Sequence, residues 1–313
     1  MKNTRLITEG AVLLAVFIIL LLATLYIPVL NIVLPLTLPL PFIIFSMRYD
    51  LKHTWLLLAA ASLITIIVSS PFNVATAIMF GTTGIVLGSM YKKQKGPVEL
   101  LLVGTLTYML NMVVLYIISV RFFEYNFIQE FQTVFGQSIK QAEQFIKATG
   151  AQVNEKQLQQ LKEFPKLLGY IIPSVFVLGA AMMSWLTLLL AAPILRRLRF
   201  VIKPWPFFYE IQLPRSILLY YAAFLLIVTF SRPEAGSYLY IALLNLNLIF
   251  PLLMAIQGFS FIAFFSHSKG YSKAIPIMLF IVSFFMPILF SLVSFLGIID
   301  LGFSLRRKLK PHK

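Results

Sequence analysis

Long apolar runs, separated by short polar clusters, fill most of the chain. A membrane-spanning helix needs about 20 apolar residues to cross the hydrocarbon core of a bilayer. By that measure the sequence predicts spans near 6–27, 31–47, 54–70, 72–91, 98–120, 167–195, 213–231, 237–265 and 274–302. The pattern therefore predicts an all-α fold, a polytopic transmembrane helix bundle of eight or nine spans.

The second apolar segment differs from the others because it is rich in proline. Pro28, Pro35, Pro39 and Pro41 fall in or beside it. Proline removes a backbone donor and kinks a helix, and freed carbonyls survive at membrane depth only where protein or water satisfies them. We expect this segment to be broken and packed inside the bundle.

Residues 121–166 form the one sizeable polar segment, which we expect to be external. Apolar residues recur there at helical spacing, and Gly150 and Asn154 stand where one helix would end and a second would begin. The sequence predicts two amphipathic helices, and the apolar positions are Phe127, Phe131, Val134, Phe135, Ile139, Ala142, Phe145, Ile146, Leu158, Leu161 and Phe164. They form either a scaffold on the membrane surface or a lid and docking face.

Composition agrees with the membrane assignment. The chain is 59% hydrophobic and 12% charged, whereas soluble domains carry about 25% charged residues. It contains no cysteine, which excludes disulfides and Cys-ligated metals. The first apolar run has no small-residue cleavage site, so we interpret it as a span and not as a signal peptide.

The net charge of +15 is explained by orientation in the membrane. A basic cluster at 2–5 precedes the first span, and clusters at 48–52, 92–95 and 196–203 follow the second, fourth and sixth spans. All of them lie on the cytoplasmic side if the N-terminus is cytoplasmic. Nucleic-acid binding is not expected, because aromatic and basic residues do not interleave on any soluble stretch. The expected partner is the lipid bilayer of the cell membrane.

The basic tail complicates the number of spans. Nine crossings would place Arg306 and its basic neighbours outside, whereas eight would keep them cytoplasmic, and the sequence does not identify the segment that fails to cross. The organisation we expect is spans one to five at 1–120, an external segment at 121–166, span six at 167–195, a basic loop at 196–212, further membrane segments at 213–302 and a basic tail at 303–313.

Catalytic motifs are absent from the sequence. There is no HExxH, GxSxG or P-loop pattern, and none of the three histidines has a metal-ligand partner at helical spacing. The centres of the spans carry no Asp, Glu, Lys or Arg, although ion-coupled transporters usually keep acids there. We therefore expect no enzyme activity, no cofactor, no metal and no autonomous pump.

Neutral polar residues do occur inside the predicted bundle. They either form interhelical hydrogen bonds or line a pocket for a small uncharged ligand, and the candidates for such a pocket are Asn31, Asn73, Thr76, Tyr108 and Asn111. Two acids lie near span ends. Glu9 either interacts favourably with the N-terminus of its helix or has a function. Asp300 either pairs with the basic tail or has a function.

Small residues predict where helices approach closely. Gly81, Gly84 and Gly88 share one helical face and are expected to pack against another helix. Ala11 and Ala15 give the first span a similar face, used either inside the bundle or by a partner membrane protein.

The sequence resembles the YybS family of bacterial multispanning membrane proteins. The resemblance rests on Thr4-Arg5-Leu6 before an Ala-rich span, the Pro-rich second segment, the uncharged hairpin at Pro71 and the span around Gly84-Ile85-Val86-Leu87-Gly88. It extends along most of the chain.

More distantly, residues 1–195 are similar to the substrate-binding S components of energy-coupling-factor vitamin transporters and to the cell-shape protein MreD. The first resemblance implies six helices with both ends cytoplasmic, an external ligand pocket, and docking of a coupling subunit through Ala11 and Ala15. S components end near their sixth helix, whereas this chain continues for over 100 residues. The expected function is a solute-binding or transport component, and the alternative is a non-catalytic scaffold for envelope or signalling proteins.

Overall fold

A computed structural model describes residues 2–29, 31–148 and 155–309 of the chain. Within these ranges the chain is helical and has no β-strand, which confirms the predicted all-α class. The helices form two compact units, Met1–Glu130 with Val175–Pro204 and Phe131–Ser174 with Trp205–Lys313. The predicted Gly150 stop and Asn154 cap lie outside the described residues.

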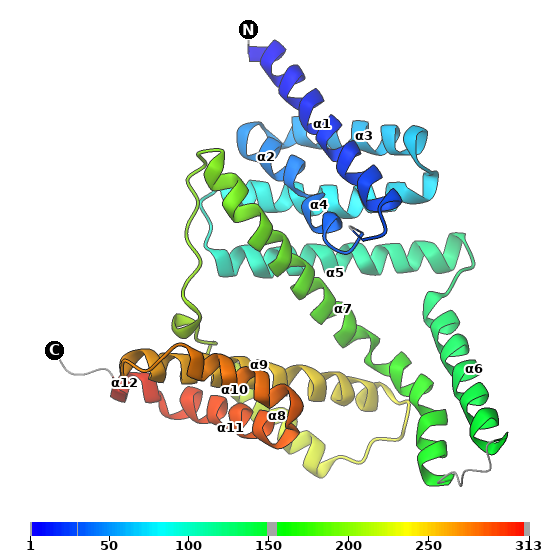
Figure 1. Cartoon of the computed structure of the whole chain (residues 1–313), viewed down its shortest axis with the longest axis vertical. Helices are drawn as coiled ribbons and strands as arrows, with labels where there is room; N and C mark the ends of the chain where they lie inside the picture. Colours follow the sequence, from blue (N-terminus) through cyan, green and yellow to red (C-terminus); the bar gives the residue numbers. More distant parts are fainter. Residues whose placement is uncertain (1, 30, 149–154, 310–313) are drawn as a thin grey trace. The chain divides into compact units, whose positions relative to one another are not determined.

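The first unit begins with five apolar helices (Figure 1). Their bounds are α1 (Lys2–Tyr26), α2 (Leu40–Arg48), α3 (Leu51–Val68), α4 (Val74–Lys92) and α5 (Pro97–Phe122), with short 3₁₀ turns η1 (Leu34–Thr37) and η2 (Pro71–Asn73). The Pro-rich segment is broken as predicted, because η1 and the nine-residue α2 replace a continuous span. Most of α2 is buried among its neighbours.

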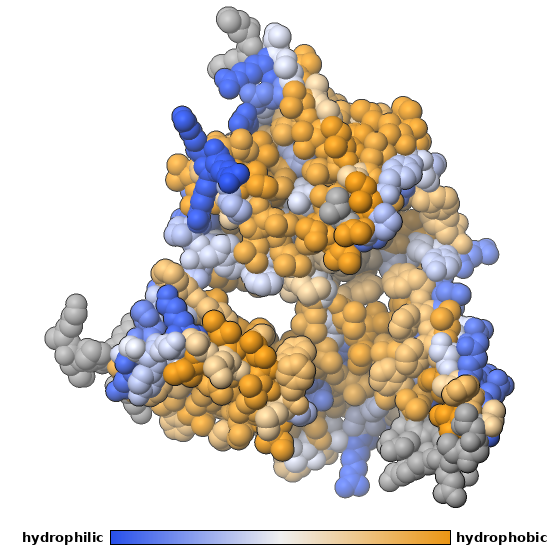
Figure 2. All heavy atoms as spheres, in the orientation of Figure 1, coloured by the Kyte–Doolittle hydropathy of each residue, from blue (hydrophilic) through white to orange (hydrophobic). Residues whose placement is uncertain are grey.

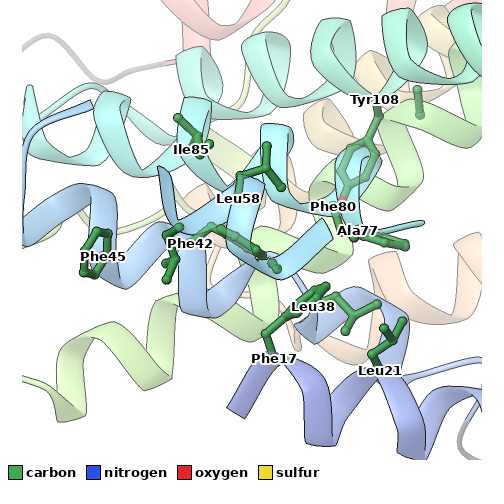
Figure 3. Packing of buried hydrophobic residues seen from close by; sticks show 13 residues of the cluster. Phe17, Leu21, Leu38, Phe42, Phe45, Leu58, Ala77, Phe80, Ile85 and Tyr108 are labelled. Carbon is green, nitrogen blue, oxygen red and sulfur yellow. The ribbon is translucent and has the colours of Figure 1, made fainter. Parts of the chain in front are cut away.

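The core of the first unit is aromatic and aliphatic (Figure 3). Phe17 of α1 meets Phe42 of α2 edge-on, with ring centroids 5.1 Å apart, and Phe80 of α4 meets Tyr108 of α5 at 6.0 Å. Such edge-to-face pairs add about 0.5–1.5 kcal/mol beyond the area they bury. This packing holds the short α2 in the interior.

The second unit contains the C-terminal helices, which lie side by side in Figure 1. They are η3 (Phe208–Glu210), α8 (Ser216–Phe230), α9 (Tyr238–Ser268), α10 (Ala274–Phe285), α11 (Pro287–Phe303) and α12 (Leu305–Leu309). The closest contact is between α9 and α11, where Gly258 and Gly297 bring the two backbones together. A Cβ at either glycine would overlap a carbonyl oxygen of the facing helix.

The apolar run 274–302, predicted as one span, is instead two helices. Met286 adopts an extended conformation (φ −122°, ψ 95°) and separates α10 from α11, which begins at Pro287. Their 12 and 17 residues span only about 18 and 26 Å, less than the roughly 30 Å of a bilayer core. Both helices pack against α9 and against each other, and α11 returns alongside α10 (Figure 1).

The polar segment contributes α6 (Phe127–Ala148), but the second predicted helix is not separate. Residues 155–197 form one continuous helix, α7 (Glu155–Arg197), so the expected boundary between 166 and 167 falls inside it. A change from polar to apolar side chains does not interrupt backbone hydrogen bonding. Glu143 of α6 forms ion pairs of 2.8 Å with Lys147 and with Lys162 of α7.

On the side that Figure 2 shows, the surfaces of both units are largely hydrophobic. Among the residues that the structure describes, six helical segments are long and apolar enough to cross a membrane: Thr4–Tyr26, Leu51–Val68, Pro71–Lys92, Pro97–Phe122, Leu161–Arg197 and Tyr238–Ser268. Most of their side chains are not buried within the protein. Helices with exposed apolar side chains and internally paired backbone groups are compatible with a lipid environment.

Candidate functional site

The most organised polar site in the described residues lies where α11 ends. Ser304 adopts the left-handed conformation (φ 51°, ψ 48°), which ends α11 and reverses the chain into α12. This reversal points the Arg306 side chain back along α11, where Nε donates to Asp300 Oδ2 at 2.9 Å. Arg215, before α8, donates to the Ser304 hydroxyl from the other side.

The pair formed by Asp300 and Arg306 is buried. Asp300 is 0% exposed and Arg306 is 7% exposed. Gln257 of α9 also donates to Asp300 Oδ2, while its own carbonyl oxygen accepts from the backbone N–H of Leu213 at 2.8 Å. The predicted pairing of Asp300 with the basic tail is thereby confirmed.

The guanidinium of Arg306 also holds the chain that precedes α8. Its Nη1 donates to the carbonyl oxygens of Tyr209 and Ile211 at 2.9 and 3.0 Å. Ser260 of α9 accepts from Nη2 at 3.1 Å, and its hydroxyl lies 2.7 Å from the carbonyl oxygen of Phe208. The network therefore fixes residues 208–213 against α9 and α11.

Buried ion pairs contribute little net stability, because removing two charges from water offsets their attraction. Their main effect is to make alternative arrangements costly, since a separated partner would be left charged and buried. In this protein the Asp300–Arg306 pair fixes the position of η3 and its aromatic residues.

Those aromatic residues form one wall of a cavity of about 690 Å³. Tyr209 is stacked between Phe207 (centroids 5.2 Å apart) and His267 (4.2 Å). The opposite wall comes from α9 and α10, and the full lining is Phe207, Phe208, Tyr209, Phe259, Ala263, Ser266, His267, Gly270, Tyr271, Lys273, Pro276, Ile277 and Phe280. Pockets that bind small molecules are typically of this size, mostly apolar, and contain a few polar groups.

The polar groups of this aromatic cavity lie at one end. His267 closes α9, and Lys273 precedes α10. No Asp or Glu is among the 13 lining residues. The nearby carboxylate of Glu210 accepts from the backbone N–H of Phe207 at 3.0 Å, so it caps its own turn. The cavity is therefore mostly apolar, with the Lys273 ammonium and the His267 imidazole among its lining groups.

A second polar cluster occurs in the first unit around Glu9. Its carboxylate accepts from Arg5 and from Arg48, each at 2.9 Å, and from the Tyr49 hydroxyl at 3.0 Å. Burial, followed by the hydrogen bond to Glu9, raises the pKa of Tyr49. Glu9 thus links α1 to the end of α2 through side chains.

Three of the five polar residues predicted to line a pocket are hydrogen-bonded to other side chains. Tyr108 is buried and bonds Thr187 at 2.9 Å, Asn111 donates to Thr82 at 3.0 Å, and Asn73 donates to Ser69. Asn31 is exposed and Thr76 is half-buried. These are contacts between or within helices.

An apolar pocket of about 500 Å³ does lie under the first turn of α6. Tyr116 of α5, Phe127 of α6 and Phe176 of α7 contribute to its lining. None of the five predicted polar residues lines this pocket or the aromatic cavity.

The small residues occupy two different environments. A Cβ at Gly84 would lie 2.5 Å from the carbonyl oxygen of Pro39, one at Gly88 would lie 2.7 Å from that of Ile43, and one at Gly81 would overlap Leu58. This glycine face of α4 therefore contacts α2 and α3. Ala11 and Ala15, in contrast, are exposed on α1.

Sequence reasoning did not identify the aromatic cavity. A local signal exists in Trp205-Pro206-Phe207-Phe208-Tyr209, which contains four aromatic residues. Proline disfavours the α-helical conformation for the residue before it. The hydrogen-bond partners of this segment are Ser260 and Arg306, which lie 52 and 97 positions after the residues they bind. No local sequence pattern connects residues that far apart.

Comparison with known proteins identifies relatives of the whole chain. Residues 15–301 match the family described as "Predicted membrane protein (DUF2232)". The chain is 35% identical to the "Uncharacterized protein YybS" of Bacillus subtilis (strain 168), over 99% of this chain and 100% of that protein. No solved structure matches the chain. The predicted resemblance to YybS is confirmed.

Proposed function

Since the chain belongs to the DUF2232 family of membrane proteins, we propose that it is the ligand-binding component of a transport system in the cell membrane. The observation that carries this proposal is the aromatic cavity of about 690 Å³ in the second unit. Its wall is held by the buried Asp300–Arg306 network, so the site is formed before a ligand arrives. A preformed site reduces the entropy lost on binding.

Binding fits this site better than catalysis does. The cavity offers one imidazole and one ammonium, His267 and Lys273. The nearby buried carboxylate of Asp300 is bound by Arg306 and Gln257 and does not line the cavity. General acid–base chemistry needs a group within hydrogen-bond reach of the reacting atom, and here the acid and the cavity are separate.

The basic tail and the loop before α8 lie at the same end of the second unit, because Arg306 binds the carbonyl oxygen of Tyr209. We count α10 and α11 together as one hairpin, because Met286 separates them and both pack against α9. The proposed topology then has eight crossings, two of which are the short segments Leu34–Arg48 and Ser216–Phe230, and both termini are cytoplasmic. The external side would then carry only seven of the 26 Lys and Arg residues: Arg121, Lys140, Lys147, Lys156, Lys162, Lys166 and Arg232. This distribution satisfies the positive-inside rule.

Single cysteines test the topology, because the chain contains none of its own. A membrane-impermeant maleimide should label Ser138→Cys in intact cells and Ser272→Cys only after lysis. Labelling of Ser272→Cys in intact cells would contradict the proposed topology.

The binding proposal is tested by filling the cavity. Ile277 lines it and is 58% exposed, whereas Ile288 of α11 is 75% exposed and lies outside it. The wild type and Ile288→Trp, purified in detergent, should retain a small molecule detectable by mass spectrometry, and Ile277→Trp should lose it. A wild type that is reproducibly empty, or equal retention by both variants, would refute the proposal.

The second candidate function is a scaffold of the MreD type, which the exposed face of α1 favours. Ala11 and Ala15 are exposed there, and small residues allow another helix to approach closely. Replacing both with leucine should remove a membrane partner from pull-downs, while Val114→Leu on α5 should not. An unchanged set of partners would count against this surface.

A further inference from the structure

We infer that the occupant of the aromatic cavity is an anionic membrane lipid, with its phosphate at Lys273 and His267 and an acyl chain along α10. This inference rests on the proposed binding function and specifies its ligand. It requires that the cavity favour negative charge at Lys273 and His267, that it extend into the hydrocarbon, and that it open to the bilayer.

Charge complementarity points to an anion. Lys273 and His267 line the cavity, and Lys269 lies between them in the sequence, in the turn that joins α9 to α10. The 13 lining residues include no acid, and the carboxylate of Glu210 is engaged by the backbone of Phe207. A phosphate at this position would meet cationic groups without a competing carboxylate in the lining.

The depth of the cavity points to a lipid. From Lys273 the lining continues through Pro276 and Ile277 to Phe280, and seven residues of helix cover about 10 Å. Phe259 of α9 meets Phe280 edge-on at the far end of this lining, with centroids 5.1 Å apart. The slot therefore leads from the polar end of α10 into the apolar part of the second unit.

The cavity also opens toward the membrane. Ile277 and Phe280 are 58% and 51% exposed, and their neighbours Met278 and Ile281 continue an apolar outer face of α10. A lipid already in the bilayer could enter sideways with its acyl chain in hydrocarbon throughout. A soluble anion would have to leave an apolar slot of this length unfilled.

The position in the membrane is consistent with an anionic lipid. Lys273 lies at the end of the second unit where Arg306 binds Tyr209, because Tyr209 also stacks on His267. In the proposed topology this end faces the cytoplasm. The cytoplasmic surface attracts basic residues through anionic lipids, at about 1 kcal/mol for each Lys or Arg.

Native mass spectrometry of the full chain in nanodiscs tests the inference. The lipids are phosphatidylcholine alone or with phosphatidylglycerol, and the variants are Lys273→Gln, the matched control Lys140→Gln on α6, and Ile277→Trp. We expect phosphatidylglycerol to remain bound preferentially to the wild type and to Lys140→Gln. Lys273→Gln should lose about fivefold in affinity, which is about 1 kcal/mol, and Ile277→Trp should lose binding altogether.

The outcomes separate the two proposals. Equal retention of both lipids, unchanged by Lys273→Gln but abolished by Ile277→Trp, would overturn the anionic lipid and keep the binding cavity. Displacement of the lipid by free glycerol phosphate at equal concentration would likewise overturn it in favour of a soluble anion. No effect of Ile277→Trp on any ligand would overturn the binding cavity itself.

Discussion

Replacing Arg306 with methionine should destabilise the second unit more than any surface substitution. Methionine keeps the apolar stem of the side chain but removes the guanidinium that binds Asp300, Tyr209 and Ile211. Asp300 is 0% exposed, so its charge would remain buried without its partner. Removing one member of a buried pair costs about 3–5 kcal/mol. We expect the free energy of unfolding to fall by this amount.

The measurement can be confined to the second unit. The chain has three tryptophans, and replacing Trp55 and Trp185 with phenylalanine leaves Trp205, next to η3, as the fluorescent reporter. Unfolding is followed by titrating a denaturing detergent into mixed micelles. Arg307→Met is the matched control, because Arg307 is adjacent and exposed, and surface substitutions usually change stability by less than about 0.5 kcal/mol.

The pairing itself is tested by the double variant Asp300→Leu with Arg306→Met. Without either charge the desolvation penalty disappears, so the double variant should be more stable than Arg306→Met alone by at least about 1 kcal/mol. Equal effects of Arg306→Met and Arg307→Met, or a double variant less stable than the single one, would refute the role assigned to the pair.

Two further perturbations test other contacts. Gly258→Ala would press a methyl group into the backbone of α11, so the free energy of unfolding should fall by about 1–3 kcal/mol. Gly302→Ala, with only ordinary contacts nearby, should be neutral. Hydrogen bonds from Lys147 and Lys162 lower the pKa of Glu143 to about 2. Because the folded-state pKa is the lower one, protection of α6 from hydrogen exchange should be full above about pH 5 and decrease as the pH falls toward 2. Glu143→Gln should remove this pH dependence.

The sequence predicted helices well where one apolar run made one helix. Spans near 6–27, 54–70, 72–91 and 98–120 correspond to α1, α3, α4 and α5, because each run is long enough to cross and ends in turn-forming or basic residues. The prediction of one span was wrong for 274–302, where a mostly apolar run of 29 residues is broken at Met286. Pro287 was the available signal, since proline is favoured in the first turn of a helix.

The candidate site was only partly predictable. Pairing of Asp300 with the tail followed from their separation of six residues, which a reversed helix end can bridge. The contacts of Arg306 with Tyr209 and Ile211 depend on how α9 and α11 pack through Gly258 and Gly297. Hydrophobic periodicity identifies helices but not which helices become neighbours, so the aromatic cavity could not be derived from it.

The network around Arg306 also sets an order of events during synthesis. Arg306 leaves the ribosome 97 residues after Tyr209, whose carbonyl oxygen it binds. Synthesis proceeds at about 5–20 residues per second, so Arg306 is added roughly 5–20 s after Tyr209. Until then the backbone carbonyls of residues 209–211 depend on water or on translocation factors. The aromatic cavity is therefore completed among the last steps of biogenesis, and a chain truncated in α11 would have its preceding membrane helices but no Arg306 to hold the cavity wall.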